Sequence, residues 1–162
     1  MAEVAVTRKG QQRIEQGHLW IYRSDITLKG KDPAPGSIVK VLSAKKEFLG
    51  QAFYSSLSQI ALRMLTSSKE TIDDNFWKNR LQTAFNLRNK VVNNAEAYRL
   101  LHGEADLIPS LVIDRYQNYF VIQTLSQGTD LLKNTWVKLL VELFQPKAVI
   151  ERNDVKVRKL EG

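Results

Sequence analysis

The sequence contains no cysteine, which excludes disulfide bonds and a thiolate nucleophile within its 162 residues. A cytoplasmic location is the simplest interpretation of this absence. Histidine occurs only as His18 and His102, and without cysteine partners this makes a structural zinc site improbable. Long hydrophobic runs are also missing, because Lys138 and Glu142 interrupt the apolar run 136–144, and a transmembrane helix is therefore excluded. The first residues lack the basic and then apolar order of a signal peptide.

Glycine is scarce and scattered. The chain has eight glycines, and no two of them lie within three residues of each other. They are Gly10, Gly17, Gly30, Gly36, Gly50, Gly103, Gly128 and Gly162. A cofactor-binding turn between a strand and a helix needs closely spaced glycines, because the backbone must approach the ligand there. The sequence therefore predicts that no such turn is present.

What the chain does have is an excess of positive charge, +7 in total. The excess is uneven, because residues 1–70 carry +5 and residues 71–162 carry +2. A basic surface attracts polyanions such as RNA over long distances. Many basic domains do not bind nucleic acid, so charge alone leaves an RNA-binding role and an incidental excess both open.

Residues 1–70 have the pattern of a small domain rich in strands. A short helix is expected over 11–16, ended by Gly17. Three strand-like stretches come in close succession: residues 37–42, 48–54 and 59–65. The first two flank a basic hairpin tip at 43–47. Such closely spaced short strands favour a small barrel, and the polar stretch 66–70 predicts its boundary.

The remainder predicts a connecting helix followed by a small α+β sheet domain. Thr71 or Asp73 is the expected cap of a helix that runs to about Val92. The elements expected after it are strand 98–101, a hairpin at 111–125 with its turn at Gln117-Asn118, a helix from Gly128 to Pro146, and strand 147–151. A charged tail, 152–162, completes the chain. We therefore predict domains at 1–70 and 95–162, joined by the helix at 71–94.

The acidic loop before the hairpin invites a catalytic or metal-binding interpretation. His102, Glu104 and Asp106 lie close enough in sequence to ligate one metal ion, but residues this close in a loop more often cap turns, and capping is preferred. The pair Asp114-Arg115 places a cation either at an RNA phosphate or in an ion pair on an edge strand. The ion pair is the preferred interpretation.

Several stretches resemble, in order, a family of class I SAM-dependent large-subunit rRNA methyltransferases, the RNA cytosine-C5 methyltransferases with an N-terminal PUA domain. The most specific is Gly-Glu-Ala-Asp-Leu-Ile-Pro-Ser-Leu-Val-Ile-Asp-Arg-Tyr at 103–116. The others are 17–26, 35–39, 48–55 with 60–63, and 148–154 with 158–162. The resemblance implies a PUA-like mixed β-barrel, a helix and a small α+β sheet domain. It also implies that a Rossmann-like catalytic domain, absent from this chain, follows Gly162.

By the same resemblance, the whole protein uses S-adenosylmethionine, and large-subunit rRNA is its RNA partner. Forming 5-methylcytosine requires a thiolate that attacks the base. Because this chain has neither a cysteine nor a glycine-rich turn, we expect it to be inactive alone, to bind no cofactor or metal, and to hold RNA for the missing catalytic domain. The main alternative is a free-standing PUA-type RNA-binding module, and a structural or protein-interaction domain is the third. A homo-oligomer is left open, and no membrane association is expected.

Nine side chains are candidates for RNA contact in the PUA-like segment. The cations would bind phosphates, and the aromatic rings would stack on an unpaired base. They are Arg8, Lys9, Arg13, Trp20, Tyr22, Arg23, Lys45, Lys46 and Arg63. For each of them a structural role is also open, such as a core position for Trp20 or a solvated hairpin tip for Lys45 and Lys46.

Overall fold

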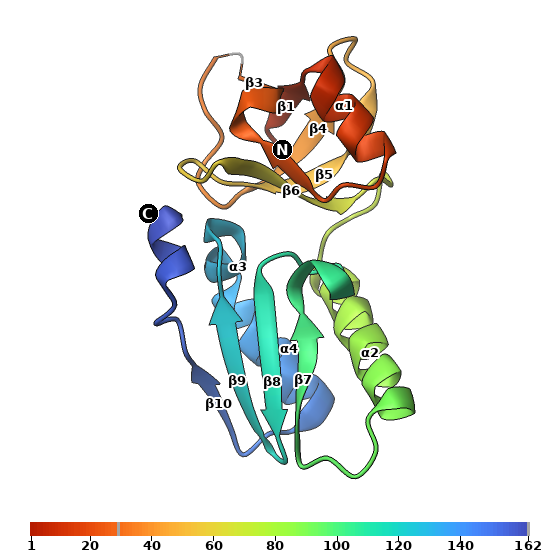
Figure 1. The fold of residues 1–162 in the computed structure, drawn as a ribbon, viewed down its shortest axis with the longest axis vertical. Coiled ribbons are helices and arrows are strands. Elements are labelled where there is room, and N and C mark those ends of the chain that lie inside the picture. Colours follow the sequence, from red (N-terminus) through yellow and green to blue (C-terminus); the bar gives the residue numbers. More distant parts are fainter. Residues whose placement is uncertain (29, 162) are drawn as a thin grey trace. The chain divides into compact units, whose positions relative to one another are not determined.

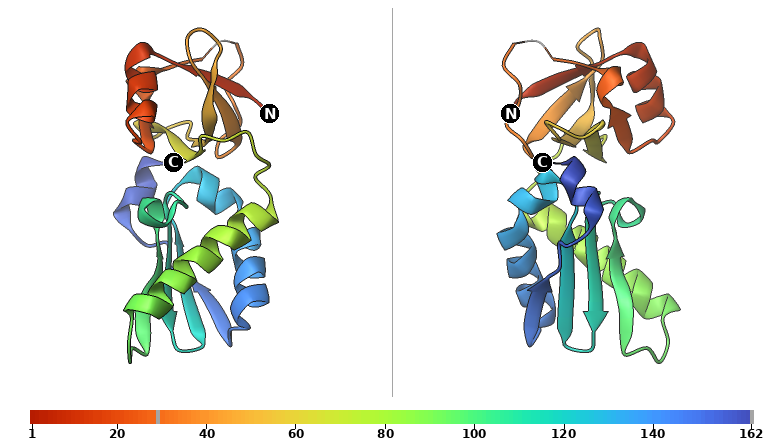
Figure 2. Two further views of the ribbon diagram at one scale, coloured as in Figure 1. Left: turned by 90° about the vertical axis from the view of Figure 1, so that its right-hand side faces the viewer. Right: turned by 60° about the vertical axis from the view of Figure 1, so that its left-hand side comes forward.

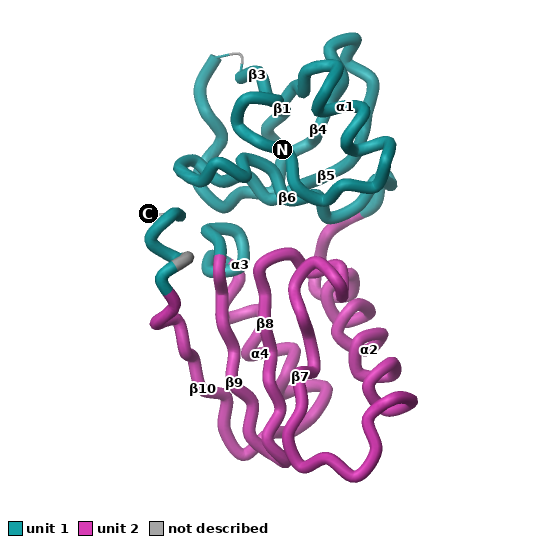
Figure 3. Tube along the Cα trace, in the orientation of Figure 1, with its two compact units in different colours: residues 1–70, 126–131, 156–162 teal, residues 71–125, 132–155 magenta. Residues whose placement is uncertain are grey.

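The structure is a computed structural model that describes residues 1–28 and 30–161, except the side chain of Val157. Two compact units divide the chain (Figure 3). The barrel unit comprises residues 1–70, 126–131 and the segment from 156 onward, and the sheet unit comprises 71–125 and 132–155. Residues 126–131 and the segment from 156 onward, both expected in the domain at 95–162, thus pack in the barrel unit. The domain boundaries themselves stay a prediction. Gly162, the last residue of the expected tail, lies outside the described residues.

The barrel unit is built on six strands, which are best seen in Figures 1 and 2. They are β1 (Glu3–Val6), β2 (Trp20–Tyr22), β3 (Ile26–Thr27), β4 (Ile38–Leu42), β5 (Phe48–Tyr54) and β6 (Ile60–Thr66). Their order in the sheet is β2-β6-β5-β4-β1-β3, and only the β1–β4 pair is parallel. The two edge strands are joined by the short 3-10 helix η1 (Arg23–Asp25), so the sheet is nearly closed into a barrel.

Alternating apolar residues fill the interior of this barrel. Their side chains are almost completely buried, and they come from five of the six strands: Val4, Val6, Ile21, Val39, Val41, Ala52, Tyr54, Leu62 and Met64. Burial of this apolar surface is the main stabilising contribution to such a small sheet. The hairpin and the third strand expected from the sequence are confirmed. The short strands β1 and β3 were not expected from the sequence.

Helix α1 (Arg8–Glu15) begins three residues earlier than the sequence pattern predicts. The reason is an N-cap: the Thr7 hydroxyl accepts a hydrogen bond from the Gly10 amide at 3.2 Å. The helix ends as expected before Gly17, whose φ of +83° is a left-handed conformation that suits glycine.

The sheet unit has four strands in the order β10-β9-β8-β7. Its elements are α2 (Asp74–Val91), β7 (Ala97–His102), the 3-10 helix η2 (Gly103–Asp106), β8 (Leu111–Tyr116), β9 (Tyr119–Thr124), α4 (Lys133–Phe144) and β10 (Ala148–Glu151). Strand β10 runs parallel to β9, and the other neighbours are antiparallel. Asp73 caps α2, with its carboxylate accepting from the Phe76 amide at 3.0 Å, as one of the two expected caps.

Aromatic side chains join the helices and the sheet of this unit. Trp77 of α2 meets Trp136 of α4 edge to face at 5.0 Å between ring centres. Phe144 of α4 contacts both Phe85 of α2 and Phe120 of β9, at 5.0 and 5.3 Å. The architecture predicted from the sequence, a small mixed barrel followed by a helix and a small α+β sheet, is confirmed by the order and pairing of these elements.

The helix expected from Gly128 to Pro146 is instead two helices, so this prediction was wrong. Helix α3 (Gln127–Leu131) ends at Leu131, and α4 starts at Lys133. The break has a packing cause, because α3 packs against β5 in the barrel unit whereas α4 packs against α2 in the sheet unit.

In the β8–β9 turn Gln117 adopts a positive φ of +52°. One further detail differs from the sequence predictions. Asp114 is paired with Arg99, at 2.8 Å, rather than with Arg115. Strand β8 is also interior to its sheet, so the expected edge-strand ion pair is wrong. Within the described residues, no helix has both the length and the apolar character needed to cross a membrane.

Candidate nucleic-acid interface

A cleft of about 490 Å³ lies on the barrel unit between α1 and the β4–β5 hairpin tip. Four of its lining residues come from α1 at positions i, i+3, i+4 and i+7: Arg8, Gln11, Gln12 and Glu15. This spacing places them on one face of the helix. Ala44, Lys45 and Glu47 of the hairpin tip line the opposite side. The fold therefore brings together Arg8 and Lys45, two of the predicted RNA-binding residues.

The hairpin tip has a defined conformation, which Ser43 organises. Its buried hydroxyl accepts hydrogen bonds from the amides of Lys45 and Glu47, at 3.2 and 3.1 Å, and donates to the Glu47 carboxylate at 3.0 Å. The Lys46 amide donates to the Ser43 carbonyl at 2.9 Å, and Lys46 adopts a left-handed φ of +66°. The two lysines therefore project from an ordered turn.

Four of the predicted cations are exposed and without a carboxylate partner among the described residues: Arg8, Lys9, Lys45 and Lys46. We call these four residues the basic rim. The cleft itself also contains Glu15 and Glu47, so its lining is not net basic. Glu15 accepts a hydrogen bond from Gln11 at 2.9 Å. The positive character of this surface therefore depends on the basic rim as a whole and not on the cleft floor.

Trp20 and Tyr22 lie two residues apart on the edge strand β2 and keep 42% and 36% of their surface exposed. Alternate residues of a strand point to the same side, so both rings belong to one face. The core position considered for Trp20 is therefore wrong. The Arg13 guanidinium lies 5.1 Å from the centre of the Tyr22 ring. Its Nε is also 3.3 Å from Oδ2 of the buried Asp25, an ion-pair contact without the alignment of a hydrogen bond.

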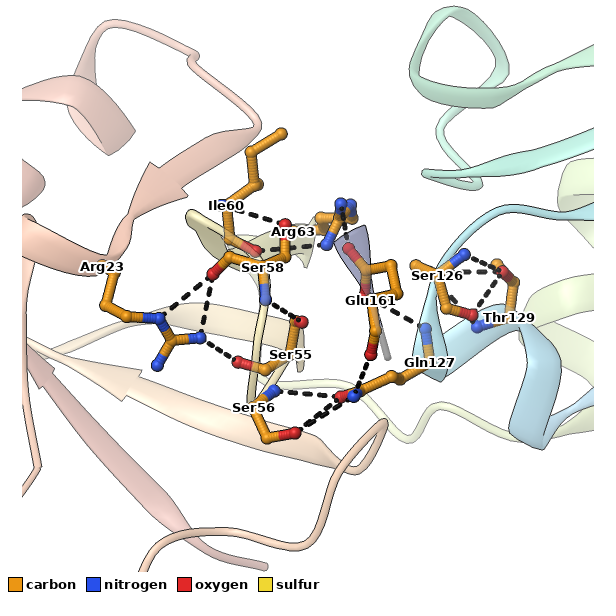
Figure 4. A network of polar contacts seen from close by, with 10 residues as sticks. All are labelled: Arg23, Ser55, Ser56, Ser58, Ile60, Arg63, Ser126, Gln127, Thr129 and Glu161. Carbon is orange, nitrogen blue, oxygen red and sulfur yellow. Dashed lines mark hydrogen bonds and ion pairs between the residues drawn. The ribbon is translucent and has the colours of Figure 1, made fainter. Parts of the chain in front are cut away.

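Arg23 holds the β5–β6 turn. Its guanidinium donates to the carbonyl oxygen of Ser55 at 2.6 Å and to that of Ser58 at 2.9 and 3.1 Å (Figure 4). These bonds satisfy backbone carbonyls of a turn whose Ser55 and Ser58 are buried. Arg23 thus shapes the surface near β2, with most of its donors already engaged.

Arg63 is buried, with only 7% of its side chain exposed, and it forms an ion pair with Glu161 at 2.8 Å. The same Glu161 carboxylate accepts from the Gln127 amide at 3.3 Å, and the Gln127 side chain donates to the Glu161 carbonyl and to the Ser56 hydroxyl, at 2.6 and 3.0 Å (Figure 4). We call Arg63, Glu161, Gln127 and Ser56 the latch. Because its guanidinium is enclosed, Arg63 stabilises the barrel unit and is poorly placed for RNA contact.

The acidic loop of the sheet unit has a capping role. One Asp106 oxygen accepts from the His102 amide at 2.6 Å, and the carboxylate pairs with Arg88, also at 2.6 Å through Nη2. Among the residues that the structure describes, no group of three metal-binding side chains is found. The preferred interpretation of this loop, turn capping, agrees with these contacts.

Residues 125–129 form the turn from β9 into α3, and the chain then returns through α4 to β10, the parallel neighbour of β9. This strand-to-helix turn does not fit S-adenosylmethionine. A Cβ atom on Gly128 would lie 2.4 Å from Cγ of Phe53, so this glycine serves close packing and not ligand approach. The Gln127 amide, which would face a ligand, already donates to Glu161. Protein groups therefore fill this turn.

A family model described as PUA-like domain matches residues 4–67, which include the six strands of the barrel apart from Glu3, the first residue of β1. This part of the chain is therefore similar to PUA-like domains. The ribosomal RNA large subunit methyltransferase I of Vibrio parahaemolyticus is 38% identical over 163 residues, which covers 99% of this chain and 41% of that protein. The protein of the same name from Photobacterium profundum is 37% identical and covers 95% of this chain and 40% of its own length.

Solved structures agree with this relation at the level of the fold. The crystal structure of SMU.776 complexed with SAH superposes with a TM-score of 0.80 at 16% identity, covering 94% of this chain and 40% of that one. The resemblance to rRNA large-subunit methyltransferases predicted from the sequence is confirmed by the curated relatives, because the chain is similar along nearly its whole length to part of these proteins. It spans about two fifths of the length of the curated relatives it matches.

The latch was missed by the sequence analysis, although one signal pointed to it. Arg63 lies in a strand whose other residues, from Ala61 to Leu65, are apolar and buried. An arginine in such a stretch needs a buried carboxylate partner. The partner could not be identified from the sequence, because Glu161 lies 98 residues away.

Proposed function

We propose that this chain is the RNA-binding and substrate-orienting part of a SAM-dependent rRNA methyltransferase. The relation to rRNA large-subunit methyltransferases along nearly its whole length supports the RNA class. The observation that carries the proposal is the basic rim on the PUA-like domain, four exposed cations without carboxylate partners in the described part of the chain. Such cations gain more from a phosphate than cations already paired within the protein.

In this proposal the nine candidate residues have three different roles. The basic rim binds backbone phosphates, which position an RNA without reading its sequence. Trp20 and Tyr22, on their exposed face, stack on unpaired bases. The other three candidates act indirectly, because their guanidinium groups hold protein groups: Arg13, Arg23 and Arg63.

The methyl transfer itself belongs to another part of the full-length protein. S-adenosylmethionine would supply the methyl group there, and by family resemblance the target is carbon 5 of a cytosine in large-subunit rRNA. This chain binds and orients the RNA, and we expect a cytoplasmic protein. Since the turn before α3 does not accommodate the cofactor, no chemical step is assigned to the residues of this chain.

The proposal is tested by RNA affinity measured against salt concentration for the wild type and for Lys45→Glu. Each phosphate contact that is lost should make the slope of log K against log salt shallower by about one. A cation–phosphate pair at about 4 Å in water contributes roughly 1 kcal/mol, so reversing the charge should weaken binding by at least about fivefold.

The matched control is Lys31→Glu, which changes the net charge equally on an exposed residue of the barrel unit outside the cleft. We expect Lys31→Glu to retain most of the affinity. Equal losses in the two variants would mean that only net charge matters and would remove the basic rim from the proposal. A wild-type affinity that does not respond to salt would reject the RNA-binding role.

The alternative, a free-standing RNA-binding module, predicts the same binding data. The coding sequence distinguishes the two proposals. A reading frame that continues past Gly162 into a glycine-rich SAM-binding loop supports the methyltransferase. A stop codon immediately after Gly162 would favour the module.

A further inference from the structure

A second cleft, of about 550 Å³, lies within the sheet unit and is lined by residues from the end of α2, the start of β7 and the end of β8. Figure 1 shows where these elements lie. This volume falls in the range of ordinary small-ligand sites, about 300–1,000 Å³. The polar side chains that line it are those of Arg88, Asn89, Asn94, Glu96, Tyr98, Arg115 and Gln117. It therefore offers one phenol, three amides, two guanidinium groups and one carboxylate.

Arg115 is held in a fixed position in this cleft. Its Nε donates to the Gln117 carbonyl at 2.8 Å, and its Nη1 donates to the Tyr98 hydroxyl at 3.2 Å. The guanidinium carbon also lies 5.7 to 6.0 Å from the ring centres of Phe120, Phe85 and Tyr98. These contacts orient the group while leaving other N–H donors, since a guanidinium has five.

The charge of Arg115 is not compensated by a carboxylate in the described residues, which distinguishes it from its neighbours. Arg88 pairs with Asp106, and Arg99 pairs with Asp114, whose hydrogen bond raises the pKa of Arg99. Arg115 is partly buried among aromatic rings. A cation removed from water without a counter-ion is unfavourable, and aromatic rings offset this only in part. The arrangement thus favours an anionic ligand.

We propose that this cleft binds one phosphate-bearing nucleotide of a single-stranded RNA segment, with the phosphate at Arg115. This inference rests on the proposed RNA-binding function. Arginine is suited to the task, because its planar fork donates two parallel hydrogen bonds to a phosphate. The amides of Asn89, Asn94 and Gln117 can both donate and accept, as the polar edges of a base require.

Glu96 limits the affinity of the site and supplies its sharpest test. Its exposed carboxylate lines the same cleft and repels a phosphate. Glu96→Gln removes that charge and keeps the size of the side chain, so we expect tighter RNA binding, by about threefold to fivefold for a weak repulsion across solvent. Arg115→Lys keeps the charge but loses the fork, and should weaken binding by a similar factor.

The experiment is NMR titration of the whole chain, monitoring the Arg115 Nε–H signal and the Gln117 amide. The probes are a single-stranded RNA tetranucleotide, a nucleoside monophosphate and inorganic phosphate. We expect the tetranucleotide to shift both signals with the highest affinity, Glu96→Gln to tighten this binding and Arg115→Lys to weaken it. Lys90→Gln, an exposed residue of α2 outside the cleft, is the control and should have little effect.

Three results would overturn the proposal. The first is that the Arg115 signal does not shift with any probe. The second is that inorganic phosphate binds as tightly as the tetranucleotide. The third is that Glu96→Gln does not increase the affinity for the tetranucleotide. If the wild type binds larger RNA in a manner that depends on Lys45 while the Arg115 signal does not move, this inference fails and the proposed function stands. If no RNA binds at all, the proposed function fails as well.

Discussion

The latch allows a quantitative prediction about the barrel unit. Arg63 and Glu161 each keep only 7% of their side chains exposed, and their charged atoms are 2.8 Å apart. Removing one partner of a buried ion pair leaves an uncompensated charge and typically costs about 3–5 kcal/mol. We therefore expect Arg63→Met, which leaves Glu161 unpaired, to destabilise the barrel unit by about 3 kcal/mol or more.

The double variant separates the pair from its individual members. Replacing both residues with apolar ones of similar volume, Arg63→Met with Glu161→Leu, removes both charges together and should cost much less than the sum of the single changes. Part of the cost will remain, because the Gln127 amide loses its acceptor on Glu161. We expect a coupling free energy of about 2–3 kcal/mol, at the upper end of values for residues in one network.

Hydrogen exchange is the appropriate assay, because the chain has two compact units and global unfolding need not be two-state. Exchange of the β6 amides reports on the barrel, and exchange in 156–161 reports on the docked segment. If Glu161→Leu accelerates exchange only in 156–161, its cost is confined to the docking of that segment and is measured by the change in its opening free energy. Single variants that each cost less than about 1 kcal/mol, with no coupling, would refute the buried-pair reasoning.

Three further predictions concern packing, capping and titration. Gly128→Ala should destabilise the barrel unit by about 1–3 kcal/mol in denaturant unfolding, because its Cβ would lie 2.4 Å from Phe53, and Phe53→Leu should relieve part of this. Asp73→Ala should cost about 1 kcal/mol by removing the cap of α2, seen as faster amide exchange in its first turn. The hydrogen bond to Asp74 raises the pKa of Lys138 above its usual 10.5. The contribution of the charged Lys138 to stability is therefore fully present below pH 10.5 and is lost as pH rises through its raised pKa. Asp74→Asn should lower the pKa of Lys138 in an NMR titration.

Elements that depend on local pattern were predictable. The β4–β5 and β8–β9 hairpins and helix α2 result from alternation, helical spacing and capping residues, all of which act over a few positions. The split between α3 and α4 was not predictable in this way. Its cause is the packing of α3 on β5, far away in the sequence, and the apolar pattern continues through the break.

The candidate interfaces show the same division. Arg8, Lys9, Lys45 and Lys46 were selected by charge, but the sequence could not separate them from Arg23 and Arg63. What distinguishes the two sets is the distance to backbone carbonyls and carboxylates, which only the tertiary structure provides.

By itself the sequence determined the class of the protein: a basic α+β chain without cysteine or a glycine-rich turn, related to rRNA methyltransferases. Absence of a residue type needs no coordinates, because no fold can supply a group that the chain lacks. Only the tertiary structure decided which charges are available. Arg63 and Arg115 are both arginines in β-strands. The charge of Arg63 is compensated by Glu161, 98 residues away, whereas no carboxylate among the described residues compensates the charge of Arg115.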